Sequence, residues 1–448
     1  MAANASIRDA ALIHSGMAGI VARIVSALCS VASVALAVNA LDVTQFGILA
    51  TLAALVGIMG FADLGLGQGL LNELTDALAR GDQARQRAVV SSASAVLLAL
   101  GAGVALVGLA VAAAFPWNLI LGAPDEEPQV VAAAVGVFGL SIGLAIPASV
   151  GHRVLLALQA GGVAHLWSAV SAVASLAATW LAATMSASLP VFVFAALGAP
   201  VLLSVTQTSW VLCLAHPELR PSRRLMTTAA ARRLLSLGWG FLVLNLSAAV
   251  AYQSDVIIVA SVLGAAAAGT FAIALRMFAL VSGLFAGLTS QMWPSVTHAL
   301  STGDLTWVRS RFRRILVLTL LVASTTCITL AVAGQSIALV WVGPDLLPPQ
   351  PLLWMLALWT IYSLAMGQCS TLLNGAGVIR PQAALGALMA AVNLPLSIIL
   401  ARHIGISGPV LGSLIAHGLF AGIPTMMLVR RVLTTGTNIG VGHDERRP

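Results

Sequence analysis

The sequence contains no lysine and very few charged residues of any kind. All 22 basic residues are arginine, and charged residues make up only 8% of the 448 residues, against about a quarter in a typical soluble protein. Without lysine there is no phosphate-binding loop of the kind that uses one, so ATP hydrolysis by such a loop is excluded. The shortage of charge also excludes a soluble globular protein of ordinary composition.

What the chain has in place of charge is long apolar segments. Apolar residues make up 59% of it, and runs long enough to cross a bilayer, about 20 residues each, recur along its length. The formal net charge of +7 does not indicate a nucleic-acid partner, because the arginines lie in short loops between apolar segments. The sequence therefore predicts an all-α polytopic membrane protein.

Cysteine and histidine give no sign of a metal site. The four cysteines, Cys29, Cys213, Cys327 and Cys369, lie far apart without metal-ligand spacing, and the eight histidines form no HExxH pair. We expect reduced cysteines with a packing role, and no catalytic residue, metal or cofactor. The N-terminal segment is too polar for a cleaved signal, so the first apolar run is interpreted as a retained helix.

An internal repeat organises the chain. The segment Thr75–Arg87, TDALARGDQARQR, returns 222 residues later as Thr297–Arg309, THALSTGDLTWVR. The same offset pairs Gly47 with Gly269. Because 222 is almost half of the chain length, one half is interpreted as a diverged copy of the other, running in the same sense.

The apolar pattern predicts twelve transmembrane helices in two pseudo-symmetric six-helix lobes. We expect the first lobe at residues 1–214, a cytoplasmic linker at 215–236, the second lobe at 237–429, and a disordered cytoplasmic tail at 430–448. The polar repeat segment Thr75–Arg87 is expected to be a hairpin loop. The predicted helices are Gly16–Val38, Gln45–Leu71, Ala88–Ala114, Gln129–Val150, His165–Met185, Pro190–Leu214, Leu237–Ser261, Thr270–Pro294, Phe312–Gln335, Pro351–Leu373, Pro381–Ala401 and Ser407–Val429.

The arginines predict the topology. With both termini in the cytoplasm, nineteen of the 22 arginines fall in cytoplasmic loops and tails, and only Arg402 falls on the far side. Positively charged loops stay inside, so we expect both termini to be cytoplasmic. The far-side loops are short, which argues against an outer catalytic domain such as a polysaccharide polymerase or ligase would need.

Four charged residues lie within the predicted spans: Arg23, Asp63, Asp255 and Arg276. Each costs about 2.5–3.5 kcal/mol at a helix centre on insertion scales, so each needs a partner or water. We expect Arg23 near Asp63 towards the cytoplasm, and Arg276 near Asp255 towards the outside. A purely structural scaffold would not need such buried charges.

A polar stripe follows one face of the first helix. Arg23, Ser26, Ser30 and Ser33 recur at helical spacing. The repeat offset maps them onto Asn245, Ala248, Tyr252 and Asp255. Both faces are predicted to avoid lipid and to line a hydrated cavity. Snorkelling arginines and helix-gluing ion pairs remain the structural alternatives.

Two other features are not interpreted as sites. Gly65, Gly67 and Gly69 have the wrong spacing for a nucleotide fingerprint, and close packing or a kink is expected there. Gln368, Asn374 and Asn393 are too sparse to define a site.

Longer segments resemble a known family. FADLGLGQGLLNELTDALARGD, YQSDVIIVASVLGAAAAGTFAIALRMF, WPSVTHALSTGDLTWVR and LLNGAGVIRPQAALGALMAAVNLPLSIIL are similar to segments of bacterial polysaccharide transporters. These are the O-antigen and exopolysaccharide flippases of the multidrug/oligosaccharidyl-lipid/polysaccharide (MOP) superfamily.

The resemblance implies alternating access and a cavity lined by helices 1, 2, 7 and 8. The implied cargo is an undecaprenyl-diphosphate-linked oligosaccharide, moved across the bacterial inner membrane for O-antigen, exopolysaccharide or capsule synthesis. A polysaccharide polymerase and chain-length machinery are the expected protein partners, and no nucleic acid is expected. Cationic cavity residues meet the diphosphate in this family, a role open here to Arg23 and Arg276.

The candidate substrate-binding residues are Arg23, Arg276, Ser26, Ser30, Asn245 and Tyr252, with Asp63 and Asp255 as charge partners or ion-coupling sites. The alternative function is a cation-coupled multidrug antiporter of the same superfamily, with Asp63 or Asp255 as its proton or sodium site.

Overall fold

The computed structural model describes residues 2–59, 63, 65–226, 254–289, 296, 299–300, 303–378 and 380–435. These residues form helices and short turns, with no β-strand among them. Within these ranges, nine helical segments are long and apolar enough to cross a membrane, and two shorter apolar helices, Val43–Gly57 and Ser254–Leu263, accompany them. The predicted all-α, multi-pass membrane architecture is confirmed.

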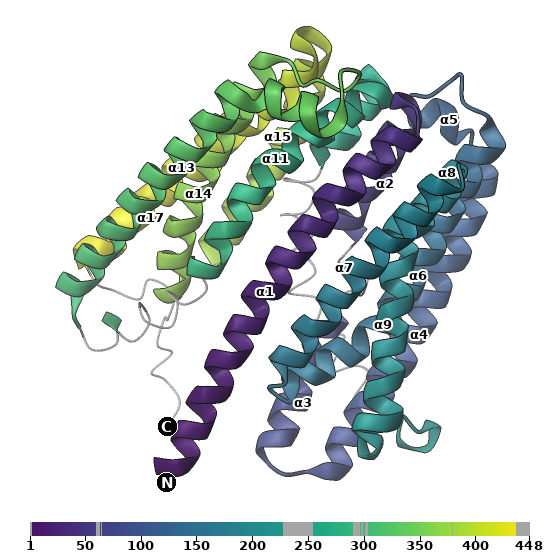
Figure 1. Cartoon of the computed structure of the whole chain (residues 1–448). Coiled ribbons are helices and arrows are strands. Elements are labelled where there is room, and N and C mark those ends of the chain that lie inside the picture. The colour runs from purple at the N-terminus through teal and green to yellow at the C-terminus, as the bar shows by residue number, and fades with distance from the viewer. Residues whose placement is uncertain are drawn as a thin grey trace. The chain divides into compact units, whose positions relative to one another are not determined.

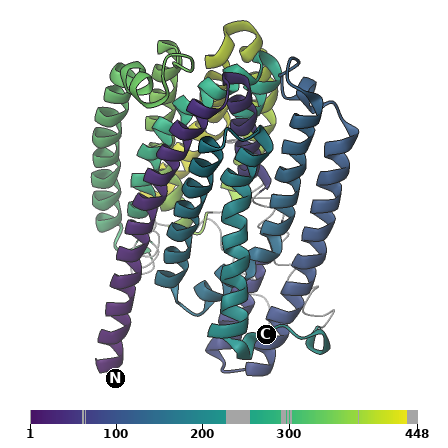
Figure 2. The ribbon, with the colours of Figure 1, turned by 45° about the vertical axis from the view of Figure 1, so that its right-hand side comes forward.

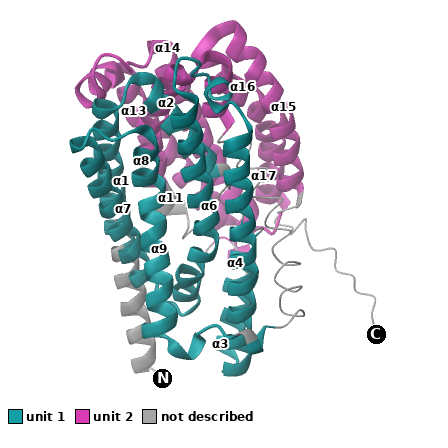
Figure 3. Cartoon of the chain, turned by 90° about the vertical axis from the view of Figure 1, so that its right-hand side faces the viewer, with its two compact units in different colours: residues 1–246 teal, residues 247–448 magenta. Residues whose placement is uncertain are grey.

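The chain divides into two compact units, residues Met1–Leu246 and Ser247–Pro448 (Figure 3). The division falls close to the predicted start of the second lobe at residue 237. Residues 227–253 and 436–448, which include most of the predicted linker and tail, lie outside the described ranges.

The first unit is a bundle of long helices. α4 packs against α6, α6 against α9, α9 against α7, and α7 against α1; α1 runs alongside α7 in both views (Figures 1 and 2). The sixth predicted span is one helical stretch in which α8 and α9 are joined and extended by π-helical turns. The helices are α1 (Ala2–Ala40), α2 (Val43–Met59), α3 (Leu66–Ala79), α4 (Gln83–Ala114), α5 (Trp117–Ile120), α6 (Pro128–Ala157), α7 (Gly161–Thr184), α8 (Leu189–Val193) and α9 (Ala199–Trp210).

The second unit contains the later helices. α13 packs against α14, α11 and α17 also contact α14, and α15 packs against α16. A π-helical turn, Gly418–Gly422, joins α16 to α17. The helices are α11 (Ala265–Thr289), α13 (Leu305–Val342), α14 (Gln350–Gly375), α15 (Arg380–Ile404), α16 (Gly408–His417) and α17 (Ile423–Thr435), preceded by the helix Ser254–Leu263.

The helix boundaries follow the sequence repeat. α4 and α13 begin at Gln83 and Leu305, and α6 and α14 begin at Pro128 and Gln350, in both cases 222 residues apart. The two pairs also pack in the same way, α4 on α6 and α13 on α14. The predicted duplication is therefore confirmed for the helices that the structure describes in both units.

The repeated polar segment forms the same turn twice. Gly81 and Gly303 have φ angles of 68° and 76°, a left-handed conformation that glycine adopts without steric cost. Asp82 caps α4 by accepting from the Arg85 N–H at 2.9 Å, and Asp304 caps α13 by accepting from the Trp307 N–H at 2.9 Å. The conserved spacing of Gly and Asp in the repeat thus has a direct structural cause.

The hairpin loop is much shorter than predicted. α3 continues to Ala79 and α4 begins at Gln83, so most of Thr75–Arg87 is helical. Its charges pair along the helix surfaces: Arg85 contacts Glu73 at 2.8 Å and Asp76 at 2.9 Å. A hydrogen bond from Arg80 lowers the pKa of the exposed Asp76 carboxyl below its ordinary value. Because these charged side chains pair with one another on the helix surfaces, a polar segment can be helical here. The polarity of Thr75–Arg87 was therefore not evidence for a loop.

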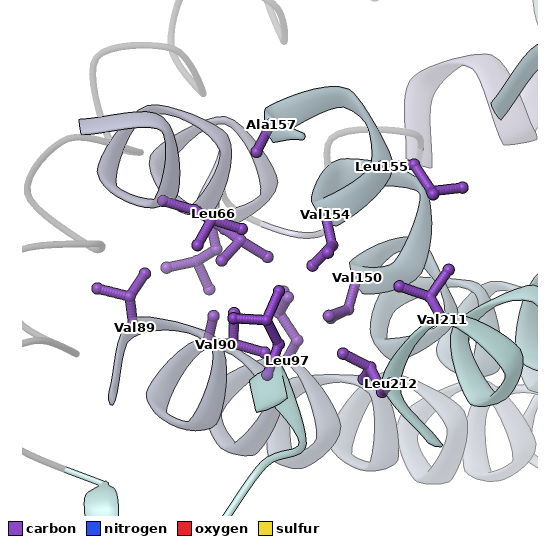
Figure 4. Close-up of a cluster of buried hydrophobic side chains, with 14 of the residues drawn as sticks. Leu66, Val89, Val90, Leu97, Val150, Val154, Leu155, Ala157, Val211 and Leu212 are labelled. Atoms are coloured by element: carbon purple, nitrogen blue, oxygen red, sulfur yellow. The ribbon is translucent and has the colours of Figure 1, made fainter. Parts of the chain in front are cut away.

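A buried apolar cluster joins this hairpin to the neighbouring helices. It contains Leu66, Leu70 and Leu74 of α3, with Val90 of α4 and Val150 of α6, among others (Figure 4). The second unit has a matching cluster, in which Val296, Phe312 and Leu372 stand at the repeat positions of Leu74, Val90 and Val150. The core of each unit therefore follows the duplication as well.

Candidate functional site

The second predicted helix is broken in the first unit. α2 ends at Met59 and α3 begins at Leu66, and Gly65 at the junction has a φ of 73°. The prediction of one helix over Gln45–Leu71 is therefore wrong. A left-handed residue cannot continue an α-helix, so the chain changes direction here. Discontinuous helices in transporters commonly mark binding sites.

Asp63 lies in this break and caps the new helix. Its carboxylate accepts hydrogen bonds from the N–H groups of Gly65 and Gly67, at 2.9 and 3.1 Å. These are two of the donors that a helix N-terminus leaves without an intrahelical partner, and the helix dipole favours a negative charge there. The membrane cost of the Asp63 charge is thus offset locally.

Arg153 is the arginine beside this break. A Cβ at Gly67 would lie 2.6 Å from Oδ2 of Asp63 and 3.0 Å from Nε of Arg153. Only glycine leaves room for both side chains, which confirms the expectation of close packing and a kink at the Gly65–Gly69 run. Arg153 is one of the nineteen arginines that the topology places in cytoplasmic loops and tails, but it lies within α6, which extends to Ala157.

Arg23 does not form the predicted ion pair with Asp63 in the described part of the chain. Its side chain is exposed on α1. Ser26, Ser30 and Ser33 are partly buried, whereas the apolar side chains of Val21, Ile24 and Leu28 are exposed. At 100° per residue the exposed apolar residues lie on the face opposite the serine stripe, which supports the prediction that this stripe avoids lipid.

Asp255 has a different partner from the one predicted. Its carboxylate accepts from the Ser413 hydroxyl, with Oγ–Oδ2 and Oγ–Oδ1 distances of 3.2 and 3.5 Å. Ser413 also lies 3.2 Å from Oδ1 of Asn393. No ion pair with Arg276 is present among the described residues, and Arg276 is exposed on α11. Both carboxylates are thus held by neutral donors, and neither pairs with the arginine expected beside it.

The structure tests only part of the predicted site. Asn245 and Tyr252, the repeat counterparts of the stripe on the first helix, lie outside the described residues. Arg153, Asn393 and Ser413 were not predicted as site residues. The sequence provided little reason to select the last two. Asn393 is one amide among several polar residues of the later helices, and serine is common in membrane helices wherever helices pack closely.

The described residues contain no cluster of three or more histidine, cysteine, aspartate or glutamate side chains that could hold a metal ion. Cys29, Cys327 and Cys369 are buried free thiols, and Cys213 is an exposed one. The three buried cysteines have the packing role expected of them, whereas the exposure of Cys213 does not fit that role.

Comparison with known proteins gives a family match and a fold match. A family model described as "Polysaccharide biosynthesis protein" matches residues 13–296, well over half of the chain. No curated protein matches.

Several solved structures share the fold. One is described as the inward-facing conformation of a multidrug resistance MATE family transporter of the MOP superfamily. It has a TM-score of 0.78 and 12% sequence identity, and the match covers 95% of this chain and 100% of that transporter's chain. A MOP superfamily transporter from Pyrococcus furiosus, whose description reports a binding pocket of reversed polarity, has a TM-score of 0.65 and 14% identity, with 95% and 96% coverage. At these identities the likeness establishes the fold.

Proposed function

The chain belongs to the polysaccharide biosynthesis protein family of the MOP flippases, and we propose that it moves a lipid-linked oligosaccharide across the bacterial inner membrane. The observation that carries this proposal is the family match over residues 13–296. The expected cargo is an undecaprenyl-diphosphate-linked repeat unit, carried by alternating access of the two lobes.

The physical requirement of this task is a way to carry a diphosphate through a low-dielectric region. A guanidinium pairs with phosphate oxygens through two parallel hydrogen bonds. Arg23 and Arg276 are the proposed contacts, one in each unit. The engagement of Asp63 and Asp255 by other donors supports this assignment, because neither arginine is neutralised by the carboxylate expected beside it.

Arg153 is a third candidate cation, which the sequence did not suggest. It lies beside a broken helix whose N-terminal N–H groups attract anions. Asp63 occupies those N–H groups in the structure. In the proposed function, Arg153 adds positive potential beside this break in the first unit.

The proposal is tested by arginine substitution in a strain that depends on this protein for polysaccharide export. Arg23→Ala and Arg276→Ala are each expected to lower surface polysaccharide at least about tenfold, because each removes a charge-assisted contact worth 1.4 kcal/mol or more. Immunoblotting of membranes checks that protein levels are unchanged.

Arg311→Ala is the matched control, since Arg311 is an exposed arginine near the start of α13, outside the proposed route. Export should be normal in this variant. Normal export in both Arg23→Ala and Arg276→Ala would refute the assignment of the two arginines. Undiminished polysaccharide in a deletion strain, together with loss of drug resistance, would favour the alternative of a cation-coupled multidrug antiporter.

A further inference from the structure

Arginines are concentrated at the end of the second unit where α13 begins. Three exposed arginines lie in the first turns of α13, and we call them the α13 arginines: Arg311, Arg313 and Arg314. Two more exposed arginines lie near the end of α17, Arg430 and Arg431. The two helix ends are neighbours, because Arg309 of α13 donates to the carbonyls of Leu433 and Thr434 of α17, at 2.6 and 3.4 Å. The five exposed arginines therefore lie at one end of the unit.

The second unit offers these arginines almost no counter-charge. Between residue 247 and Thr435 the acidic residues are Asp255, Asp304 and Asp345. Asp304 caps α13, Asp255 accepts from a serine inside the unit, and Asp345 lies in the loop at the other end of α13. None of the five arginines forms an ion pair with another described residue. The remaining residues 436–448 contain two acidic residues and two arginines, so their formal charges cancel. The positive charge at this end is thus left for an external anion.

The matching face of the first unit is covered by protein. The repeat offset of 222 pairs the α13 arginines with three buried residues of α4, namely Val89, Ser91 and Ser92. The chain beyond α9 covers this part of α4, because its short helical turns Pro217–Leu219 and Arg223–Leu225 contact α4. The Ser222 N–H also donates to the Ser91 hydroxyl at 3.0 Å. In the second unit the same positions are exposed and charged, so this face of α13 has a different neighbour.

Each α13 arginine is followed seven residues later by an exposed leucine. These leucines are 56, 36 and 63% exposed, in the order Leu318, Leu320 and Leu321. Seven residues make two helical turns, so each arginine and its leucine share one helix face, about 10 Å apart along the axis. Trp307 is also exposed and lies one turn before Arg311, and tryptophan is enriched where a helix crosses the membrane surface. The order of aromatic, cationic and aliphatic groups fits a surface between lipid headgroups and acyl chains.

We propose that the α13 arginines, with the adjoining end of α17, bind the headgroup of an anionic phospholipid whose acyl chains cover the three leucines. A guanidinium donates two parallel hydrogen bonds to phosphate oxygens, and basic clusters at the membrane surface attract anionic lipids. A soluble anion or an acidic protein would account for the arginines alone, whereas a phospholipid accounts for the arginines and the leucines together. The inference goes beyond the proposed function, because the ligand is a lipid of the surrounding bilayer and not the transported cargo.

The test is mass spectrometry of the intact full-length protein in detergent, titrated with phosphatidylglycerol or with phosphatidylcholine of the same acyl chains. Wild type is expected to bind its first phosphatidylglycerol about tenfold more tightly than its first phosphatidylcholine, because only phosphatidylglycerol carries a net charge. The combined substitutions Arg311→Gln, Arg313→Gln and Arg314→Gln should weaken phosphatidylglycerol binding about tenfold. Phosphatidylcholine binding should stay unchanged in this variant, which also shows that the variant is folded.

The matched control removes three exposed arginines of the first unit, through Arg80→Gln, Arg220→Gln and Arg224→Gln. It changes the net charge by the same amount and should bind phosphatidylglycerol as wild type does. An equal loss in both triple variants would overturn the proposal, because net charge and not this surface would then govern binding. Equal binding of the two lipids by wild type would overturn it as well.

The same titration distinguishes two other occupants. Glycerol 1-phosphate carries the phosphate without acyl chains, and displacement of phosphatidylglycerol by an equal concentration of it would overturn the proposal in favour of a soluble anion. The internal alternative is Asp444 and Glu445, because the repeat offset maps the chain that covers α4 onto residues 436–448. Asp444→Asn with Glu445→Gln should leave phosphatidylglycerol binding unchanged. A gain of about tenfold in that variant would identify these carboxylates as the occupant and overturn the proposal.

Discussion

At the scale of single residues, polar side chains in this protein are satisfied mainly by neutral partners. Asp63 and Asp82 accept from backbone N–H groups, and Asp255 accepts from a serine hydroxyl. Such bonds need only short reach, whereas a helix-to-helix ion pair needs two long side chains in one geometry and the desolvation of both charges. This is the physical reason that the expected arginine–aspartate pairs are absent from the described residues.

The two helix-capping aspartates permit a direct test. Asp82→Ala and Asp304→Ala should each destabilise the protein by about 1 kcal/mol, because the capped N–H loses its acceptor. The measurement is the Tm of the purified protein, with an expected decrease of about 1 °C per kcal/mol for 448 residues. Asp82→Asn and Asp304→Asn are the controls, since asparagine caps helices as well as aspartate. A loss as large in the asparagine variants would show that charge, and not capping, matters here.

At the scale of helices, glycine determines how closely neighbours pack. Gly108 of α4 and Gly139 of α6 bring the two backbones together, since a Cβ at Gly139 would lie 2.9 Å from the Cα of Gly108. Gly101 and Gly143 make a second such contact between the same helices. Lipid tails are as apolar as leucine, so close packing and not exclusion from water holds membrane helices together.

Gly139→Ala should therefore destabilise the first unit. The new methyl group meets backbone atoms, which cannot rotate away, and overpacking of this kind costs about 1–3 kcal/mol. Gly103→Ala on α4 is the matched control, because a Cβ there meets nothing within 4 Å and alanine favours the helix by about 0.5–1 kcal/mol. Thermal unfolding should give a lower Tm for Gly139→Ala and an equal or higher Tm for Gly103→Ala. The reverse order would contradict the role given to the α4–α6 contact.

At the scale of the whole molecule, the two halves repeat one plan in the same sense. Arg87 and Arg309, which are 222 residues apart, both bond main-chain carbonyls far along the chain in their own unit, at Arg220 beyond α9 and at Leu433 in the last turn of α17. Arg87 donates to the carbonyl of Arg220 at 3.3 Å, and Arg309 donates to that of Leu433 at 2.6 Å. An even number of spans per half requires equivalent turns to lie on the same side of the membrane.

Cysteine labelling checks this requirement. In a cysteine-free background, Arg80→Cys and Thr306→Cys, both exposed at the repeated turn, should react with a membrane-impermeant maleimide only after cells are opened. Asp125→Cys and Asp345→Cys, exposed in the loops at the other ends of α4 and α13, should react in spheroplasts with an intact inner membrane. Labelling of the two repeated turns from opposite sides would contradict a parallel duplication.

The sequence by itself determined the membrane class, the duplication and the turn at each half's hairpin. These depend on composition and on neighbours along the chain: apolar runs span the bilayer, Gly81 and Gly303 take left-handed conformations, and each following aspartate caps the next helix. The residues that share the polar face of the first helix were also predictable, since the helical spacing of side chains determines which of them lie on one face. Local rules suffice for all of these.

Only the tertiary structure decided which polar groups meet. Arg153 lies 86 residues beyond Gly67 in the sequence, and Ser413 lies 158 residues beyond Asp255, so their contact depends on how distant helices pack. That packing is controlled by glycines such as Gly67 and Gly412. The residues next to these glycines in the sequence do not show which distant helix packs against them. Spacing along a helix tells which residues share a face; the fold alone tells which faces touch.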